Sequence, residues 1–239
     1  MDNPPSLNED VILVAVAASV LLTIGLAVAR ALKIRRRAAR VLAARDVGGA
    51  GDDRMRDGEL VLVRGKARTS DAKGESTTAT PLTKRPVLWW RLTVRGETHR
   101  PGMMMWNNLL AETGARDFVL EDGKGKRVRV AIAAMPAMVL VVSDRVEKTL
   151  CMDGQKLRDD VRGFLSSRAD LADAVGADGL AAIAVRTLEE ILAAGDELQV
   201  IGVVEGGAIV PGADGLIVAH GDVKEHAKSG RVWARGPDA

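Results

Sequence analysis

The sequence predicts a mainly β protein (α+β) that is carried on one N-terminal transmembrane helix. Three observations support this fold class: an uncharged apolar run near the N-terminus, a basic cluster directly after it, and short apolar segments separated by Gly-rich turns in the remaining chain. We expect a tail over residues 1–10, the membrane helix over 11–29, a basic neck and linker over 30–58, and a β-rich domain over 59–239 with a short helical insert at about 155–177.

The run from Val11 to Ala29 contains eleven Val, Leu or Ile residues and no charged residue. As a helix it would be about 29 Å long, close to the thickness of the hydrocarbon core of a bilayer. Its aliphatic side chains would favour insertion by about 3 to 7 kcal/mol. The alternative is a buried core helix, which seldom stays uncharged over this length. The preceding segment contains no Lys or Arg, which argues against a cleaved signal peptide.

A basic cluster after the apolar run sets the expected orientation. Its members are Arg30, Lys33, Arg35, Arg36, Arg37, Arg40 and Arg45. Because Lys and Arg are retained on the cytoplasmic side, we expect a single-pass protein of a bacterial inner membrane, with its N-terminus outside and residues 46–239 in the cytoplasm. The same cluster would attract anionic headgroups, so the lipid bilayer is the first expected partner.

The charge balance of the remaining chain argues against a nucleic-acid-binding surface. Without the basic cluster and the three acidic residues of the tail, 27 basic and 29 acidic residues remain, so the pI of 8.8 reflects the neck. The one cysteine, Cys151, excludes an intramolecular disulfide and a Cys-rich metal site, and we expect a buried, inert thiol. The three histidines lack metal-ligand spacing, so no metal or cofactor is expected.

Apolar and alternating segments predict the strands of the domain. Residues 59–68 predict a strand in which Gly65 permits a bend. Residues 88–95 alternate strictly, with Trp90 on the apolar face and Trp89 on the other. Further strands are expected at residues 118–122, 126–132, 138–142, 182–190, 197–204, 215–220 and 231–234. For residues 181–194 a helix is the alternative on periodicity.

The helical insert is predicted from one amphipathic stripe. Leu157, Val161 and Leu165 recur at i, i+4 and i+8, with Phe164 beside them. Ser167 and the Asp that follows it at position 170 resemble a capping signal for a second short helix. Short strands with Gly-rich turns suit an OB-like barrel, and the sequence leaves open whether that barrel is closed.

Several short motifs in residues 60–205 follow one another in an order that resembles a known family. The motifs are Gly65, Pro81-Leu82, RPVLWWR at 85–91, Trp106, FVLEDG at 118–123, Glu189 and GDELQVIG at 195–202. Together they resemble the GIDE ("beside a membrane") domain, which occurs in the mitochondrial-anchored ubiquitin ligase and in many prokaryotic membrane proteins.

The resemblance implies a β-rich domain next to a bilayer. It does not imply ubiquitin-ligase activity, because a single cysteine cannot build the zinc-binding RING of that ligase, and the sequence predicts no second membrane helix. The mitochondrial relative places its domain in the intermembrane space, which leaves the opposite membrane orientation open.

The candidate partner surface combines aromatic, arginine and methionine side chains, namely Trp89, Arg91, Arg95, Met104 and Trp106. Aromatic and Arg side chains are enriched at binding hot spots, and Met supplies an adaptable apolar surface. For Trp89 the alternative is burial under a second layer. We expect residues 103–106 in a loop, with core packing and insertion into a membrane surface as alternatives to partner binding.

No catalytic constellation is evident in the sequence. The acidic residues Glu189, Glu190, Asp159 and Asp160 are expected to be solvated at the edges of elements, and Asp122 to belong to a turn. We therefore expect a non-enzymatic binding or scaffold module that recruits an unidentified protein or ligand to the cytoplasmic face. The alternatives are a polyanion- or nucleic-acid-binding barrel, and an enzyme-associated domain without ligase activity.

Overall fold

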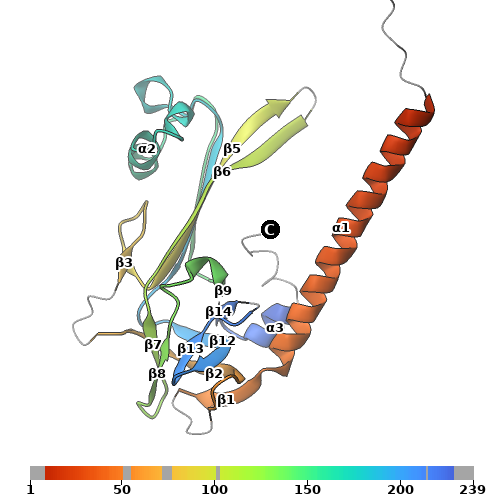
Figure 1. The fold of residues 1–239 in the computed structure, drawn as a ribbon. Coiled ribbons are helices and arrows are strands. Elements are labelled where there is room, and N and C mark those ends of the chain that lie inside the picture. The colour runs from red at the N-terminus through yellow and green to blue at the C-terminus, as the bar shows by residue number, and fades with distance from the viewer. Residues whose placement is uncertain (1–8, 51–54, 72–76, 101–102, 214, 229–239) are drawn as a thin grey trace, which may run out of the picture. The chain divides into compact units, whose positions relative to one another are not determined.

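The fold divides into a helical unit and a β-rich unit. The computed structural model describes residues 9–50, 55–71, 77–100, 103–213 and 215–228. The two compact units are residues 1–43 and 44–239. Helix α1 (Glu9–Ala43) forms the first unit, and the strands and remaining helices form the second (Figure 1).

Helix α1 is, among the described residues, the one helix long and apolar enough to cross a membrane. Its side chains at Val14, Leu21 and Leu26 are between 64% and 69% exposed, so this apolar surface has no protein cover. The helix does not stop at the end of the predicted membrane span, residue 29, but continues to Ala43 through the basic neck. No Gly or Pro interrupts residues 30–43, and Lys, Arg, Leu and Ala are strong helix formers.

Part of the predicted linker forms a strand. Strand β1 (Arg45–Gly49) pairs in parallel with β2 (Leu60–Thr69), so only Ala44 separates α1 from the first strand. A Cβ on Gly49 would lie 2.6 Å from the Asp122 Oδ2 atom. Gly49, one of the glycines that suggested a flexible linker, therefore allows β1 to lie close to the turn that contains Asp122.

A barrel-like sheet forms the centre of the second unit. Its ring consists of β2, β7 (Phe118–Glu121), β8 (Arg127–Val130), β13 (Ala208–Val210) and β12 (Glu197–Glu205). Strand β12 pairs back to β2, and only the β8–β13 pair is parallel within the ring. Strands β14 (Leu216–His220) and β9 (Val139–Val142) extend the sheet beyond β12, and the short helix α3 (Val223–Lys228) follows β14.

Strand β2 belongs to two sides of the ring because it bends at Gly65. Residues 60–66 pair with β12, whereas residues 66–69 pair with β7. A Cβ on Gly65 would lie 2.7 Å from the Glu121 carbonyl oxygen, which is closer than side chains approach backbone atoms. Only glycine fits at this position, as the bend predicted from the sequence requires.

The barrel core follows from alternation along the strands. Phe118 and Leu120 of β7 and Val128 and Val130 of β8 are at most 4% exposed, and their neighbours in sequence point outward. These side chains belong to one apolar cluster with residues of β2, β12, β13 and β14. The inward face predicted for residues 126–132 is present.

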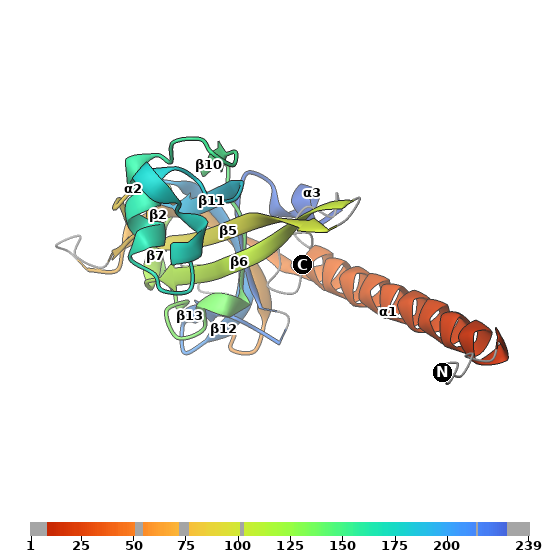
Figure 2. The same cartoon turned by 90° about the horizontal axis from the view of Figure 1, so that it is seen from above.

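A second sheet is built from two insertions into the barrel. The segment between β2 and β7 supplies a long hairpin, and the segment between β9 and β12 supplies two more strands, in the order β10-β11-β5-β6. The strands of these insertions are β3 (Thr78–Ala79), β4 (Pro86–Val87), β5 (Trp89–Arg100), β6 (Met103–Ala115), β10 (Val146–Cys151) and β11 (Val185–Leu192). Figure 2 shows helix α2 (Asp159–Ser166) beside this sheet.

The helical insert packs on the second sheet through the predicted stripe. Leu157, Val161 and Leu165 are at most 1% exposed and share a cluster with Leu92 and Val94 of β5. The cluster makes the four-stranded sheet and the insert one layered body with its own apolar core.

The second helix predicted after Ser167 is wrong. Ser167 ends α2 instead, and its Oγ donates a hydrogen bond to the Phe164 carbonyl at 2.7 Å. Only single 3-10 turns follow, at Ala172–Ala174 and Ala177–Gly179.

Other differences from the sequence prediction concern strands. Residues 103–106 are not a loop but the start of β6, because they pair with residues 97–100 of β5. Residues 185–192 form a strand, so the helical alternative is wrong. Strand β10 has a mixed polar pattern and was not predicted. The strand predicted at 231–234 lies outside the described residues.

Gly65→Ala should destabilise the barrel, because its methyl group would collide with a backbone atom that cannot move away. We expect a loss of about 1–3 kcal/mol in the free energy of unfolding. The matched control is Gly123→Ala, whose methyl group would meet nothing within 4 Å. Urea unfolding of the full chain in detergent micelles measures both variants, and equal stability of the two would contradict the close contact at Gly65.

Candidate functional site

Trp89, one of the five residues of the predicted partner surface, lies in the core. Trp89 is fully buried in the barrel cluster, together with Leu88 and Leu192. Strict alternation fails at this point because β5 contributes to two cores. Leu88 and Trp89 pack in the barrel, whereas Leu92 packs beneath the helical insert. Trp89 therefore cannot contact a partner in this fold, and burial, the alternative weighed from the sequence, is correct.

Arg91 is also occupied within the fold. Its Nε donates a hydrogen bond of 2.7 Å to Glu190 Oε2, and the two side chains are 15% and 2% exposed. The Arg91 guanidinium lies 5.8 Å from the centre of the Trp89 ring, within cation–π range. Breaking such a buried pair leaves an uncompensated charge, which typically costs about 3–5 kcal/mol. Arg91 is therefore a structural residue.

The other predicted surface residues lie on the β5–β6 hairpin. Arg95 is exposed, and its Nε donates to Asn108 Oδ1 at 2.9 Å. Trp106 is half-buried, and its neighbour Met105 is 38% exposed. The side chain of Met104 lies outside the described residues. This part of the surface is accessible, but it is separate from Trp89.

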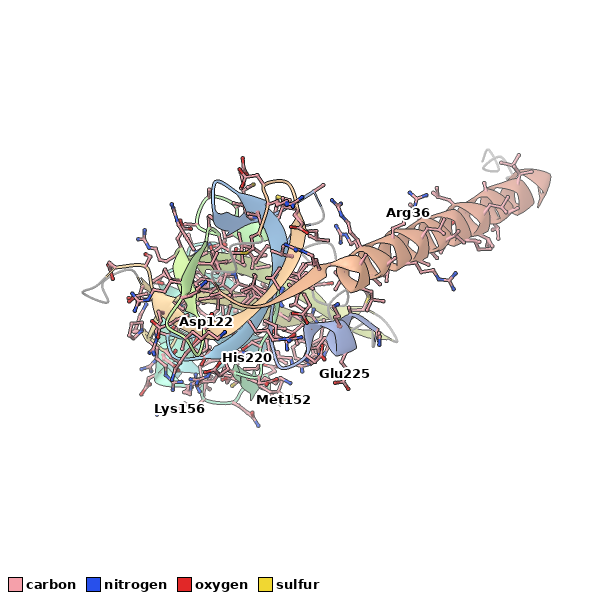
Figure 3. All side chains as sticks on the ribbon, turned by 90° about the horizontal axis from the view of Figure 1, so that it is seen from below. Arg36, Asp122, Met152, Lys156, His220 and Glu225 are labelled. Atoms are coloured by element: carbon pink, nitrogen blue, oxygen red, sulfur yellow. The ribbon has the colours of Figure 1, made fainter. Side chains whose placement is uncertain are left out.

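The basic neck lies on α1. Arg35, Arg36 and Arg40 are exposed, and Arg37 is half-buried (Figure 3 labels Arg36). The side chains of Arg30 and Lys33 lie outside the described residues.

Glu189 was expected to be solvated, but it is 2% exposed and anchors a turn. Its carboxylate accepts a hydrogen bond of 3.0 Å from the Leu82 N–H and one of 2.7 Å from the Thr83 hydroxyl. Within this turn, Lys84 has a φ of 55°, a left-handed conformation that is rare for residues other than glycine. The buried acid therefore holds the 80–85 turn in a fixed and strained shape. Of the four acids expected to be solvated, Asp159 is exposed and Asp160 is half-buried, whereas Glu189 and Glu190 are buried.

A cleft of about 350 Å³ lies beside this turn. Its wall contains two arginines and two carboxylates, and the Arg85 Nη2 atom lies 3.7 Å from Glu147 Oε2. The lining residues are Thr83, Arg85, Arg145, Val146, Glu147, Glu189 and Ile191. Most of this polarity is used within the fold, because Glu189 holds the turn and Arg145 pairs with a buried aspartate.

That aspartate, Asp196, is the centre of a buried polar network. Its side chain is 1% exposed and lies 2.7 Å from Arg145 Nη2 and 3.1 Å from His220 Nε2. The Ala193 N–H donates to the same carboxylate at 2.8 Å. Burial raises the pKa of Asp196, but the hydrogen bonds from His220 and Ala193 and the nearby positive charges outweigh it, so the pKa lies below its usual value.

Ser143, His220 and Asp196 lie in the same region without forming a nucleophilic triad. The Ser143 hydroxyl donates to the Ile191 carbonyl at 2.7 Å and accepts from the Arg145 N–H at 2.9 Å. His220 Nδ1 accepts from the Asp144 N–H at 3.3 Å, so this nitrogen faces a backbone donor and not a hydroxyl. A nucleophile requires its base within hydrogen-bond reach, and these contacts are structural instead.

A second cleft, of about 420 Å³, lies where β1, β2 and the β7–β8 turn meet. It contains the cations Arg64 and Lys66 together with the acids Glu121, Asp122 and Glu197. Arg64 pairs with Asp46 at 2.7 Å, and Glu121 pairs with Arg127 at 2.6 Å, so the cleft carries mixed charge that is largely used within the fold. Asp122 accepts hydrogen bonds from the backbone of its own turn, as predicted.

No group of three or more His, Cys, Asp or Glu side chains is placed to hold a metal ion in the described part of the chain. Cys151 is buried, and burial raises the pKa of its thiol. A thiol in this state is a poor nucleophile at neutral pH.

Sequence reasoning missed Glu189 and Asp196 as buried polar centres. Their partners Leu82 and Arg145 are distant in sequence, and the contact between Leu82 and Glu189 spans 107 residues. No local pattern encodes such a contact. Comparisons of the chain with protein-family models, with curated proteins and with solved structures give no match in any of the three.

Asp196→Asn should destabilise the protein near neutral pH by about 1–3 kcal/mol, because the amide cannot replace the charge between Arg145 and His220. The folded-state pKa of Asp196 lies below its unfolded value, so its contribution is complete above that unfolded value, near pH 3.8, and is lost as the pH falls through the lower folded value. The difference from wild type should therefore shrink on acidification.

Urea unfolding of the full chain in detergent at a series of pH values measures this difference. Asp153→Asn, at an exposed position, is the control and should change the stability by less than about 0.5 kcal/mol. A loss for Asp196→Asn that stays constant down to strongly acidic pH would contradict a role for the ionised carboxylate.

Proposed function

We propose that this protein is a membrane-tethered, non-enzymatic binding module of the GIDE-like type. It recruits a protein to the cytoplasmic face of a bacterial inner membrane. The observation that carries the proposal is helix α1. Its apolar side chains are exposed, and a single residue, Ala44, separates it from strand β1.

The continuous helix gives the tether a defined length. From residue 30 to Ala43 the helix adds 14 residues, which is about 21 Å at 1.5 Å per residue. The helix therefore ends about 21 Å along its axis from the predicted hydrocarbon boundary, and β1 begins two residues later, at Arg45. The arginines of this segment support the cytoplasmic orientation through the positive-inside rule.

Three of the residues on which the GIDE resemblance rests have structural roles in this fold. Gly65 permits the bend of β2, Glu189 fixes the turn that begins at Pro81-Leu82, and Asp196 joins three segments by hydrogen bonds and ion pairs. Each residue is one that the fold needs at that place. Short motifs that keep their order but vary in sequence are what a shared fold with variable surfaces would produce. We therefore propose the GIDE-like fold and a location beside a membrane, without ligase activity.

We infer an OB-like topology for the barrel, and this topology supports binding over catalysis. Five strands pair in a ring, the first with the second and fourth, and the third in parallel with the fifth. In OB-fold proteins the connection between the first two strands contributes to ligand binding. Here the corresponding connection, residues 70–117, contains the 80–85 turn and the β5–β6 hairpin.

A polyanion-binding barrel is the second candidate, and the same ring topology favours it. The near-neutral balance of 27 basic and 29 acidic residues outside the tail and the basic cluster argues against it. The mixed charges of both clefts argue in the same direction. We therefore place a protein partner ahead of a nucleic acid.

Replacing Leu21 and Leu22 together by Arg should release the chain from the membrane. Each change costs about 3–4 kcal/mol of insertion free energy, so the pair offsets the whole estimated gain of the helix. Sedimentation of membranes from expressing cells measures the released fraction. Leu21→Ile with Leu22→Ile is the matched control and should stay in the pellet.

The same variant tests recruitment. A proximity-labelling enzyme fused to the C-terminus should mark a reproducible set of proteins with the wild-type chain, and that set should be lost with the double Arg variant. Retention of the double Arg variant in washed membranes would contradict the tether, and labelling of no reproducible protein by the anchored chain would contradict recruitment.

Replacing Arg35, Arg36 and Arg37 together by Glu should disturb the membrane orientation. The change removes three of the positive charges that hold this end of α1 in the cytoplasm. A reporter fused to the C-terminus, active only in one compartment, measures the orientation. Substitution of the same residues by Lys should preserve it, and an unchanged orientation of the Glu variant would contradict the charge-based assignment.

A further inference from the structure

The exposed large apolar side chains of the second unit gather at one end of the four-stranded sheet. Five such residues are exposed in the described part of this unit, and four of them, Met105, Leu150, Met152 and Leu180, belong to segments that meet there. Their exposed fractions range from 37% to 59%. Exposed apolar groups scattered singly need no explanation, but a grouping at one end marks an interaction surface.

Strand register places these segments beside one another. Cys151 of β10 pairs with Val185 of β11, Val185 with Gly96 of β5, and Gly96 with Asn107 of β6. This row crosses the sheet in about 14 Å, at 4.8 Å per strand. Strand β5 continues past the row for four residues with β6 as its one paired strand, and Figure 1 shows this hairpin projecting.

The apolar residues border this row. Leu150 and Met152 flank Cys151, and Met105 lies two positions beyond Asn107, about 7 Å along the strand. Leu180 precedes Ala181, whose carbonyl accepts a hydrogen bond of 2.9 Å from the Gly154 N–H.

Two half-buried side chains complete the surface. Trp106 follows Met105 on β6, and the Ile183 side chain lies against Gly96, where an added Cβ would approach its Cδ1 to 2.7 Å. We call the set of Met105, Trp106, Leu150, Met152, Leu180 and Ile183 the apolar rim.

Basic residues accompany the apolar rim. Arg186 pairs with Leu150 on one side and with Arg95 on the other, and both arginines are exposed. Lys156 is exposed and forms a bridge with Leu180, and Figure 3 shows it at the same margin of the unit as Met152. The acids nearby in the strands and turns are Glu97, which pairs with Trp106, Asp153 and Asp178. The cations of the same segments are Arg95, Arg100, Arg186 and Lys156, so cations exceed acids by one.

We propose that the apolar rim rests on the surface of an anionic lipid bilayer. The rim lies at one end of the four-stranded sheet, and contact with a bilayer surface requires no groove of complementary shape. Met, Leu and Trp next to Arg and Lys are the composition that inserts shallowly into the headgroup region of anionic membranes. The inference rests on the proposed tether, which keeps a bilayer near the unit at all times.

The experiment uses the full chain, reconstituted in vesicles of phosphatidylcholine and phosphatidylglycerol. In a Cys151→Ala background, Met105→Cys and Leu150→Cys each carry an environment-sensitive fluorophore, and doxyl-labelled lipids act as quenchers. The control is Lys124→Cys, an exposed position in the turn between β7 and β8. We expect the two rim labels to be quenched severalfold more than the control label. Equal quenching at all three positions would overturn the proposal.

Two further readouts separate the alternatives. Arg95→Gln with Arg186→Gln should reduce the quenching of the rim labels, and unchanged quenching would contradict the role of anionic lipid. Disulfide formation between two copies through the Met105→Cys thiol, without lipid quenching, would assign the rim to a second copy and overturn the proposal.

Protection of the rim labels from lipid quenchers by a cytosolic protein would assign the rim to that partner, and would also overturn the proposal. Resistance of the chain to alkaline extraction is followed in the same vesicles. Failure of quenching with resistance intact contradicts the rim alone, whereas loss of resistance contradicts the tether.

Discussion

Strand β2 lies at the junction of the barrel because its bend at Gly65 allows one strand to pair with β12 and with β7. The Glu121 carbonyl occupies the space that a side chain at position 65 would need. Closure of the ring then fixes the points where both insertions leave and re-enter the barrel. The four-stranded sheet, the helical insert and the apolar rim therefore all depend on this one close contact.

The ionisable groups of the second unit serve mainly to hold these junctions. Glu189 fixes the turn before β4, and Asp196 joins the β11–β12 turn to β14 and to Arg145. Buried acids are costly unless they are paired, so their partners are part of the fold and are not available for chemistry. This internal use of charge is one of the observations on which we base the proposal of a binding role.

Much of the fold follows from local pattern, and the rest depends on distant contacts. The length and apolarity of α1 and the alternation along β7 and β8 were sufficient to predict those elements. Strand β1 was missed because its glycines suggested a linker, and β10 because a polar edge strand has no apolar alternation. Trp89 lies on the face opposite Trp90 and Leu92, as the alternation predicts, but that face is buried in the barrel core at this end of β5, which no local alternation can indicate.

We propose that an exposed apolar helix anchors a self-contained barrel unit in a lipid bilayer. Gel filtration of the purified wild-type chain, with and without detergent, measures whether the protein needs cover for this helix. We expect a monodisperse species only in detergent, and aggregation or loss of the protein when the detergent is removed. A monodisperse, detergent-free particle would contradict the membrane anchor.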